Sequence, residues 1–361
     1  MGETTADTTE YEIYAIRYGV NDGRLRGQNT RLQLQANGEG ERWDLPVIDL
    51  RMGDNRVQGN GTWAQTLDGR LQLELGRLVQ LWPGLRGRVN GEVTLAGTAA
   101  APSAQLELNG RNLAYQDNRL RRLNVQGQLS DGERGRLALN AERIRAGETD
   151  LGALRISAEG AAERHQAELQ LQGPLLDLAL AFDGGLRGED WLGRLTRGEL
   201  SAQQQDWALQ RPATLQRFAD GRLEFGAHCW RSGPASLCAE NQRLLPEPQI
   251  RYRLRDFSLQ TLADYLPEDL RWQGELNADI ELDLPAGGPN GRVRVDAGPG
   301  VLRIRDVDEW HDFPYQTLVL NSRLLPERID SQLRFLGGEL GELDVQLQID
   351  PRPAAKPIDG E

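Results

Sequence analysis

The six residues Arg70-Leu71-Gln72-Leu73-Glu74-Leu75 alternate polar and apolar side chains without a break. A period of two places successive side chains on opposite faces of an extended strand, so one face is apolar and the other faces water. The same alternation returns at residues 105–109, 136–140 and 168–172. Many such strands in series, with little helical sequence between them, predict an all-β protein. We expect a long curled antiparallel sheet with a few short helical turns.

Turn signals separate the alternating segments. Asn21-Asp22-Gly23, Asp68-Gly69 and the stretches 130–133 and 183–185 are rich in Asp and Gly, which favour tight turns between strands. The segments follow one another at a spacing of about 8–15 residues, which is typical of a meander. The first predicted strands cover residues 31–36, 47–51, 56–64 and 70–75.

The composition favours a thin sheet over a deep core. Of 361 residues, 39% are hydrophobic and 6% aromatic, and the mean hydropathy is −0.57. A sheet whose strands face water on one side needs no larger fraction of apolar residues, because only every second side chain is buried. The net charge is −12, and Lys356 is the only lysine. The arginines are scattered among acidic and amide residues, whereas binding a polyanion requires a net basic stripe. We therefore expect no nucleic-acid partner.

A long internal repeat organises the chain. Leu81-Trp82-Pro83 returns as Tyr265-Leu266-Pro267 after 184 residues, and in both places a strand pattern follows. Such a period favours an extended, modular sheet over one closed barrel. The expected organisation is an off-pattern segment at 1–21, a repeat unit at 22–225, a cysteine hairpin at 226–240, a second repeat unit at 241–349 and a proline-rich linker at 350–361.

One segment, just before Pro267, has helical spacing. Leu259, Leu262 and Leu266 would share one face of a two-turn helix, and Ser258 is a suitable N-cap. This helix would lie over a sheet edge or groove, or it would fill a bend in the sheet.

The two cysteines, Cys229 and Cys238, flank a Gly-Pro turn. A disulfide across this hairpin is favoured, and it would indicate an oxidising compartment. Free thiols are the next alternative. A metal site with His228 is the last, because two Cys and one His leave a tetrahedral set incomplete.

Nothing in the sequence indicates catalysis. Motifs for nucleophilic, phosphate-binding or zinc chemistry are missing from the sequence. His165, His228 and His311 are scattered and fit surface or turn positions. The densest acidic cluster, at residues 306–309, fits a solvated loop. We expect no catalytic residue, no metal, no cofactor and no enzyme activity.

The apolar phase of the strands is the candidate binding surface. A sandwich core needs bulky residues from two facing sheets, but this phase is mostly Leu and Val. A sheet curled into a trough would leave a groove for acyl chains, which gain about 0.8 kcal/mol per buried CH₂. The candidate lining residues are Leu71, Leu73, Leu75, Val93, Leu95, Leu106, Leu108, Val125, Leu137, Leu139, Leu169, Leu171, Leu178 and Leu180.

Several motifs together resemble one family. They are Leu81-Trp82-Pro83 with Gly87-Arg88-Val89-Asn90-Gly91, the turn at 97–102, Asp190-Trp191-Leu192-Gly193-Arg194-Leu195, Cys229-Trp230 with Leu237-Cys238, and the segment from Phe257-Ser258-Leu259 to Gly274-Glu275-Leu276. Over residues 22–350 the chain resembles the TamB family, subunits of the translocation and assembly module within the AsmA-like repeating β-groove, or bridge-like lipid transfer, superfamily.

The resemblance implies a β-taco fold with a hydrophobic groove. It also implies an inner-membrane anchor through an N-terminal helix and a TamA-like, Omp85-type outer-membrane partner bound through a C-terminal domain. Because neither segment matches anything in this sequence, we expect an internal fragment. No apolar run approaches the ~20 residues of a membrane span, and the first residues lack the apolar core of a signal peptide.

The expected function is therefore that of a middle segment of a periplasm-spanning protein in a Gram-negative bacterium. It would conduct phospholipids between the inner and outer membranes and support the assembly of outer-membrane proteins such as autotransporters. Its partners would be phospholipid acyl chains, the TamA-like protein and outer-membrane protein substrates. The alternative is a β scaffold or chaperone that guides outer-membrane protein strands by edge pairing.

Overall fold

The computed structural model of the chain describes residues 13–19, 23–202, 205–307 and 309–351, with the backbone alone for 13–19 and 39. This part contains 28 strands and two short 3-10 helices. Every strand pairing found within it is antiparallel, as the alternation predicted. The chain divides into two compact units, Met1–Asp177 and Leu178–Glu361. The predicted repeat boundaries at 225 and 241 remain a prediction about sequence organisation.

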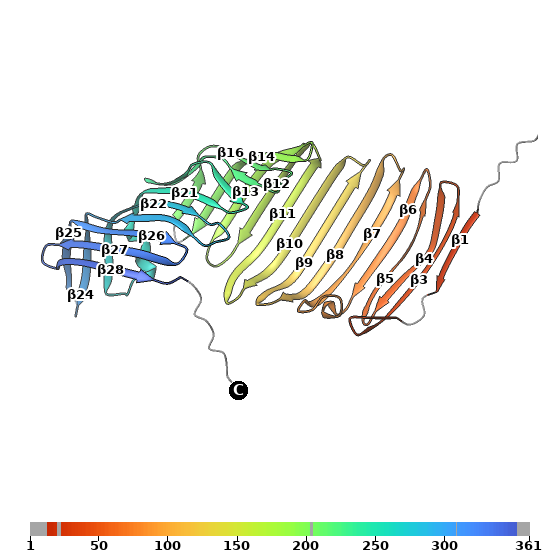
Figure 1. Ribbon diagram of the computed structural model, residues 1–361, viewed down its shortest axis with the longest axis horizontal. Coiled ribbons are helices and arrows are strands. Elements are labelled where there is room, and N and C mark those ends of the chain that lie inside the picture. The colour runs from red at the N-terminus through yellow and green to blue at the C-terminus, as the bar shows by residue number, and fades with distance from the viewer. Residues whose placement is uncertain (1–12, 20–22, 203–204, 308, 352–361) are drawn as a thin grey trace, which may run out of the picture. The chain divides into compact units, whose positions relative to one another are not determined.

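The first unit is a meander of long strands (Figure 1). From β3 to β12 each strand pairs with the next one along the chain, and β1 and β2 pair with β3. Its elements are β1 (Ile13–Gly19), β2 (Gly23–Leu25), β3 (Gln28–Glu39), β4 (Arg42–Met52), β5 (Asn55–Trp63), β6 (Leu67–Leu75), η1 (Leu78–Gln80), β7 (Arg86–Gly97), β8 (Pro102–Tyr115), β9 (Asn118–Ser130), β10 (Arg134–Ala146), β11 (Thr149–Ala161) and β12 (Arg164–Gln172).

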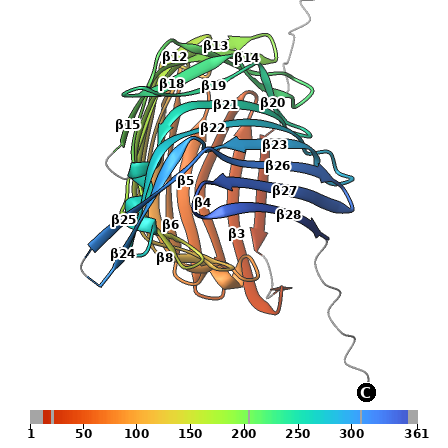
Figure 2. The same ribbon diagram turned by 90° about the vertical axis from the view of Figure 1, so that its left-hand side faces the viewer.

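The second unit has shorter strands and a branched order. β14 pairs with both β15 and β16, and β22 pairs with both β23 and β24. Its elements are β13 (Asp177–Arg187), β14 (Asp190–Ala202), β15 (Gln205–Leu209), β16 (Ala213–Arg217), β17 (Leu223–Phe225), β18 (His228–Ser232), β19 (Ala235–Ala239), β20 (Gln242–Leu245), β21 (Gln249–Ser258), η2 (Leu259–Tyr265), β22 (Leu270–Asp283), β23 (Asn290–Asp296), β24 (Gly300–Asp306), β25 (Glu309–Tyr315), β26 (Thr317–Leu325), β27 (Arg328–Gly337) and β28 (Gly341–Ile349). Figure 2 shows β21, β22, β23, β26, β27 and β28 side by side.

Two of the predicted turns are wrong. Asp68 and Gly69 lie inside β6, and Gly184 lies inside β13. A Cβ at Gly184 would come within 2.5 Å of Cζ2 of Trp191, so this glycine makes room for an indole ring. The turn at 130–133 is confirmed, since β9 ends and β10 begins there. Residues 21 and 22 of the first predicted turn, most of segment 1–21 and residues 352–361 of the linker lie outside the described residues.

A line of left-handed backbone positions crosses the first unit. Gly87, Asn112, Arg143 and Gly152 have φ values of 111°, 51°, 56° and 76° on β7, β8, β10 and β11. The two glycines are required, because a Cβ at Gly152 would lie 1.9 Å from the carbonyl oxygen of Gln172 and one at Gly87 would be similarly blocked. We call these four residues the crease. They share a level in the sheet, and the pairings of β7 with β8 and of β10 with β11 are interrupted by β-bulges at this level.

The predicted helix of the second unit exists as η2, but as a 3-10 helix. Ser258 occupies the N-cap position without a side-chain hydrogen bond. Instead, the hydroxyl of Thr261 donates to the carbonyl oxygen of Ser258 at 2.7 Å. Leu259 is completely buried, and its Cδ1 lies 3.5 Å from the place where Gly274 would carry a Cβ. The segment therefore fills space at β22, which is the role expected of a plug at a bend.

The cysteine hairpin is confirmed. Cys229 on β18 and Cys238 on β19 lie directly opposite each other and form a disulfide. The neighbouring His228 is buried, which corrects the surface or turn position predicted for it.

Large side chains are seldom buried. Of the fourteen apolar residues that are buried in the described part of the chain, seven are alanines. The thin supply of apolar residues in the sequence is consistent with this. Within the same part, no helix combines the length and the apolar character that crossing a membrane requires.

Candidate functional site

Twelve of the predicted lining residues lie on one face of the first unit. Residues directly opposite each other in neighbouring strands share a face. Leu71 lies opposite Val93, and Val93 lies opposite Leu106. Farther along, Val125 lies opposite Leu139. We call this surface the apolar face; its predicted members are Leu71, Leu73, Leu75, Val93, Leu95, Leu106, Leu108, Val125, Leu137, Leu139, Leu169 and Leu171.

The register adds residues that the sequence reading missed. Each lies directly opposite a predicted member on a neighbouring strand or shares the face of a predicted member on the same strand. The polar and apolar alternation of the sequence includes them too, but the strand pairing is needed to place them on the same face. The additional members are Val57, Val89, Leu123, Leu129, Leu154 and Ile156. The other two predicted residues, Leu178 and Leu180, lie on β13 of the second unit and share one face of that strand by their spacing.

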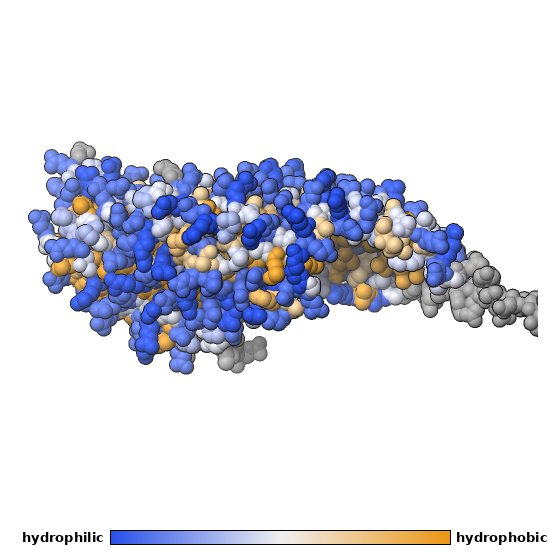
Figure 3. Space-filling model, turned by 90° about the horizontal axis from the view of Figure 1, so that it is seen from above, coloured by the Kyte–Doolittle hydropathy of each residue, from blue (hydrophilic) through white to orange (hydrophobic). Residues whose placement is uncertain are grey.

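The apolar face is only half covered. Its predicted members are half-buried, and Leu137 is 40% exposed. Neighbouring side chains on the same face supply the partial burial, as expected for one face of a single sheet. Figure 3 shows one side of the molecule, on which hydrophobic residues form patches between hydrophilic ones.

A hollow of about 550 Å³ lies on the apolar face across β7 to β12. It forms where side chains are small or missing. Gly127 lies between Leu106 and Leu137, and in the next row Gly135 lies opposite Gly160. These glycines leave space that Leu or Val would fill, so the hollow has apolar walls and a size suited to part of an acyl chain.

The opposite face of the first unit carries cross-strand ion pairs. Arg70 contacts Glu92 at 2.7 Å, and Arg136 contacts Glu159 at 3.0 Å. The hydrogen bonds from Arg136 lower the pKa of the Glu159 carboxyl, so that pair is ionised at neutral pH. Exposed pairs of this kind contribute little to stability. They do keep this face in water and leave the apolar face as the one available to apolar ligands.

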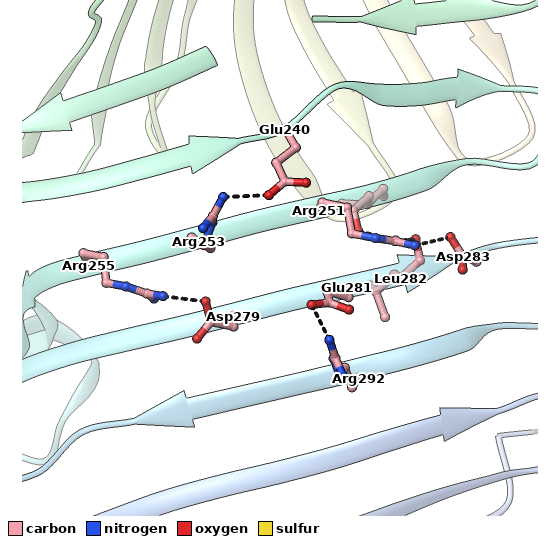
Figure 4. Close-up of polar contacts among 10 residues, drawn as sticks. Glu240, Arg251, Arg253, Arg255, Asp279, Glu281, Leu282, Asp283 and Arg292 are labelled. Atoms are coloured by element: carbon pink, nitrogen blue, oxygen red, sulfur yellow. Dashed lines mark hydrogen bonds and ion pairs between the residues drawn. The ribbon is translucent and has the colours of Figure 1, made fainter. Parts of the chain in front are cut away.

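The second unit has a ladder of ion pairs on β21, β22 and β23 (Figure 4). Arg251 contacts Asp283 at 2.7 Å, and Arg255 contacts Asp279 at 2.6 Å. On the next strand, the guanidinium of Arg292 lowers the pKa of Glu281 through a 2.8 Å hydrogen bond. A polar hollow of about 1440 Å³ extends from this ladder over β26, β27 and β28. Its charges of both signs are largely paired, which favours a solvated surface.

Among the residues that the structure describes, no three His, Cys, Asp or Glu side chains are placed to hold a metal ion. His228 has its Nδ1 2.8 Å from the carbonyl oxygen of Gly226 and its Nε2 3.2 Å from the hydroxyl of Tyr252. Burial lowers its pKa, which keeps the ring neutral. This histidine is a packed structural residue.

Comparison with known proteins gives one family. A family model described as "TamB, N-terminal domain" matches residues 20–361. The "Translocation and assembly module subunit TamB" of Haemophilus influenzae is 24% identical over 200 residues, which are 54% of this chain and 15% of that protein. The matched region is thus a small part of the length of this relative. No solved structure matches the chain.

Proposed function

Because this chain belongs to the family of the TamB N-terminal domain, we propose that it is a segment of a longer envelope protein that holds phospholipid acyl chains on its apolar face. In this role it conducts lipids between the inner and outer membranes as part of a translocation and assembly module. The name of its relative in Haemophilus influenzae, a subunit of a translocation and assembly module, supports the assignment to such a module.

The observation that carries this proposal is the continuity of the apolar face. Its rows run through β6, β7, β8, β9, β10, β11 and β12 without a polar row between them. An acyl chain of sixteen carbons gains on the order of 10 kcal/mol when it is fully buried, before ordering costs. A face that is only half covered by its own neighbours offers a part of this gain at every position along the sheet.

The same membership supports a proposed location and proposed partners. The Cys229–Cys238 disulfide supports an oxidising compartment, which for a Gram-negative bacterium is the periplasm. A TamA-like outer-membrane protein and outer-membrane protein substrates such as autotransporters are the proposed partners of the longer protein, and an N-terminal helix is its proposed inner-membrane anchor. We assign no docking residue in this chain to any of them.

Site-specific photo-crosslinking in living cells tests the proposal. A crosslinker at position 137 or 139 points from the apolar face, whereas one at position 136 or 138 points from the opposite face. Phospholipid should be captured at 137 and 139 and not at 136 and 138. Capture at 136 and 138 alone, or at none of the four positions, would show that the apolar face is not the lipid path.

A second experiment fills the hollow on the apolar face with an added side chain and leaves the residues of the apolar face in place. Gly135→Leu places a side chain in the hollow, where the nearest atoms to its Cβ are 3.9 Å away. It should reduce phospholipid that co-purifies with the chain, as measured by native mass spectrometry. Gly287→Leu is the control, because its Cβ meets nothing within 4 Å and it lies outside the first unit. Equal lipid loss in both variants would contradict the role of the hollow.

The edge of the second unit supports the alternative function. β28 pairs only with β27 among the described strands, and Leu343, Leu347 and Ile349 are 51%, 54% and 51% exposed. An open edge with exposed apolar residues is able to accept another strand. If the chain guides outer-membrane protein strands, crosslinkers on β28 should capture nascent barrel proteins, while those on the apolar face should capture no lipid.

A further inference from the structure

A second hollow lies at the crease of the first unit, and its walls are basic. It has a volume of about 700 Å³ and is lined by Arg119, Arg121, Arg143, Arg145 and Asp150, together with atoms of Leu120 on β9 and of three residues of β8. In a chain with a net charge of −12, four guanidinium groups around one carboxylate are an unusual local excess of positive charge.

Asp150 lies directly opposite Arg145 on β11, but it forms no ion pair with any of the four arginines in the described part of the chain. Within the residues that the structure describes, the four guanidinium groups make no ion pair or hydrogen bond. Arg119 and Arg145 lie directly opposite each other on β9 and β10. Like charges in this position destabilise a sheet. Oδ1 of Asp150 accepts a hydrogen bond from the backbone N–H of Gly152 at 2.9 Å. This carboxylate therefore has fewer acceptor positions left for the arginines.

The basic hollow is separate from the apolar face. Leu113 reaches to 2.9 Å from the place where a Cβ of Gly110 would be, so Leu113 lies on the apolar face. The adjacent row, in which Ala114, Arg119 and Arg145 lie opposite one another, therefore points to the other face. The side of the hollow that carries Arg119 and Arg145 thus faces away from the proposed lipid path.

The backbone around the hollow is strained. Asn112 and Arg143 both line it, and both have the left-handed backbone described for the crease. This conformation is unfavourable for a residue with a Cβ, and less so for asparagine than for arginine. Strain of this kind is concentrated at binding and switching sites. Here it coincides with a like-charge pair, so two unfavourable features meet at one place.

We propose that this hollow is a binding site for a multivalent phosphate anion, such as a phosphate monoester or pyrophosphate. Arginine forks bind phosphate oxygens with paired hydrogen bonds. Four guanidinium groups and one carboxylate leave three positive charges, which a dianion or trianion matches better than a phosphodiester with one charge. A hollow of this size is in the range of small-ligand sites. The ligand is soluble or is the headgroup of a lipid with a terminal phosphate.

Calorimetric titration of the whole chain with pyrophosphate and with glycerol 3-phosphate tests the site. Both should bind saturably at low salt, and dimethyl phosphate should bind at least tenfold more weakly. Arg119→Gln with Arg145→Gln should weaken pyrophosphate binding at least tenfold. Arg134→Gln with Arg164→Gln removes the same charge from exposed positions on β10 and β12 that do not line the hollow, and it should change the affinity by less than twofold.

Folding and ligand source are measured separately. Because Arg119→Gln with Arg145→Gln removes a like-charge pair, this double variant should melt at or above the temperature of the wild type. A variant that lost binding because it was partly unfolded would melt at a lower temperature. Sedimentation with vesicles that contain phosphatidic acid or phosphatidylglycerol separates a lipid headgroup from a soluble ligand. Binding to phosphatidic acid vesicles alone supports the site with a lipid source. If no anion binds saturably, or if both double variants lose binding equally, the proposal is wrong, and the apolar-face proposal is unaffected.

Discussion

Asn55 shows how much one polar side chain does at a strand end. It is one of three polar residues that are buried in the described part of the chain. Its Nδ2 donates to the carbonyl oxygens of Met52 and Arg77 at 3.1 and 3.0 Å, and its Oδ1 accepts from the N–H of Arg77 at 3.0 Å. It therefore ties the start of β5 to the segment that begins η1.

Replacing Asn55 by Ala should lower the free energy of unfolding by roughly 2–3 kcal/mol, because several buried backbone groups lose their partner at once. Denaturant unfolding followed by circular dichroism measures the change. Asn140→Ala, at an exposed position on β10, is the matched control and should cost less than about 0.5 kcal/mol. Similar losses in both variants would show that the network around Asn55 is not important for stability.

His228 gives the fold a pH dependence. Burial lowers its folded pKa below the value of about 6.5 expected in the unfolded chain. The unfolded chain therefore takes up the proton first. The contribution to stability is present above about pH 6.5 and is lost as the pH falls through the folded pKa, by at most about 1.4 kcal/mol per pH unit.

Unfolding free energies measured between pH 7.5 and pH 5 should thus decrease more steeply for the wild type than for His228→Gln. His311→Gln, at an exposed position, should keep the wild-type slope. A slope that does not change in His228→Gln would assign the pH dependence to other groups.

Residues of the apolar face could be predicted from the sequence because alternation alone decides which side chains share a face. The burial of His228 could not. Its environment consists of the ring of Phe225, with ring centroids 4.1 Å apart, and of Tyr252, 24 positions along the chain. Such contacts depend on how β17, β18 and β21 come together, and no local pattern records that.

At the scale of elements, the strands were predictable and the glycines were not. A glycine next to Asp is typical of a turn, but inside a sheet it also marks a place where another group comes close. Gly69 lies opposite Gly61 and Leu95 within three paired strands. An Asp-Gly pair occurs both in turns and inside strands. Only the residues that lie opposite it in the sheet distinguish the two cases. The crease was missed for the same reason, since its residues lie far apart in the chain.

The β18–β19 hairpin should depend on its disulfide. Cys229 and Cys238 are separated by 9 positions, and closing a ring of this size stabilises a fold by roughly 2–3 kcal/mol in the loop-entropy model. Cys229→Ala with Cys238→Ala should lower the melting temperature, and dithiothreitol should lower that of the wild type but not that of the variant. An equal effect of dithiothreitol on both proteins would rule out the disulfide as the cause.

At the scale of the whole molecule, the described part of the chain consists of sheet with few buried large side chains. Leu259 is the largest side chain that is fully buried in it. The sequence predicted this arrangement through its low apolar content and its long alternating phases. The division into two units at residue 177 has no comparable sequence signal, because alternation continues on both sides of it.

The heat capacity change of unfolding measures how much apolar surface the folded chain buries. Compact proteins gain about 12–15 cal/mol/K per residue on unfolding, mainly through newly exposed apolar surface. With its apolar face already half exposed, this chain should gain less per residue in scanning calorimetry than a compact protein of equal length measured alongside it. A value within the usual range would mean that the apolar face is covered in solution.

The half-covered apolar face also has a consequence for how this sequence changes in evolution. In a closed core, each side chain must match the shape of its neighbours on all sides, and volume changes are penalised. A position on the apolar face has open space on one side, so Leu, Val and Ile are nearly interchangeable there, and selection acts on apolar character at every second position. Identity between relatives can then drift low while the pattern persists.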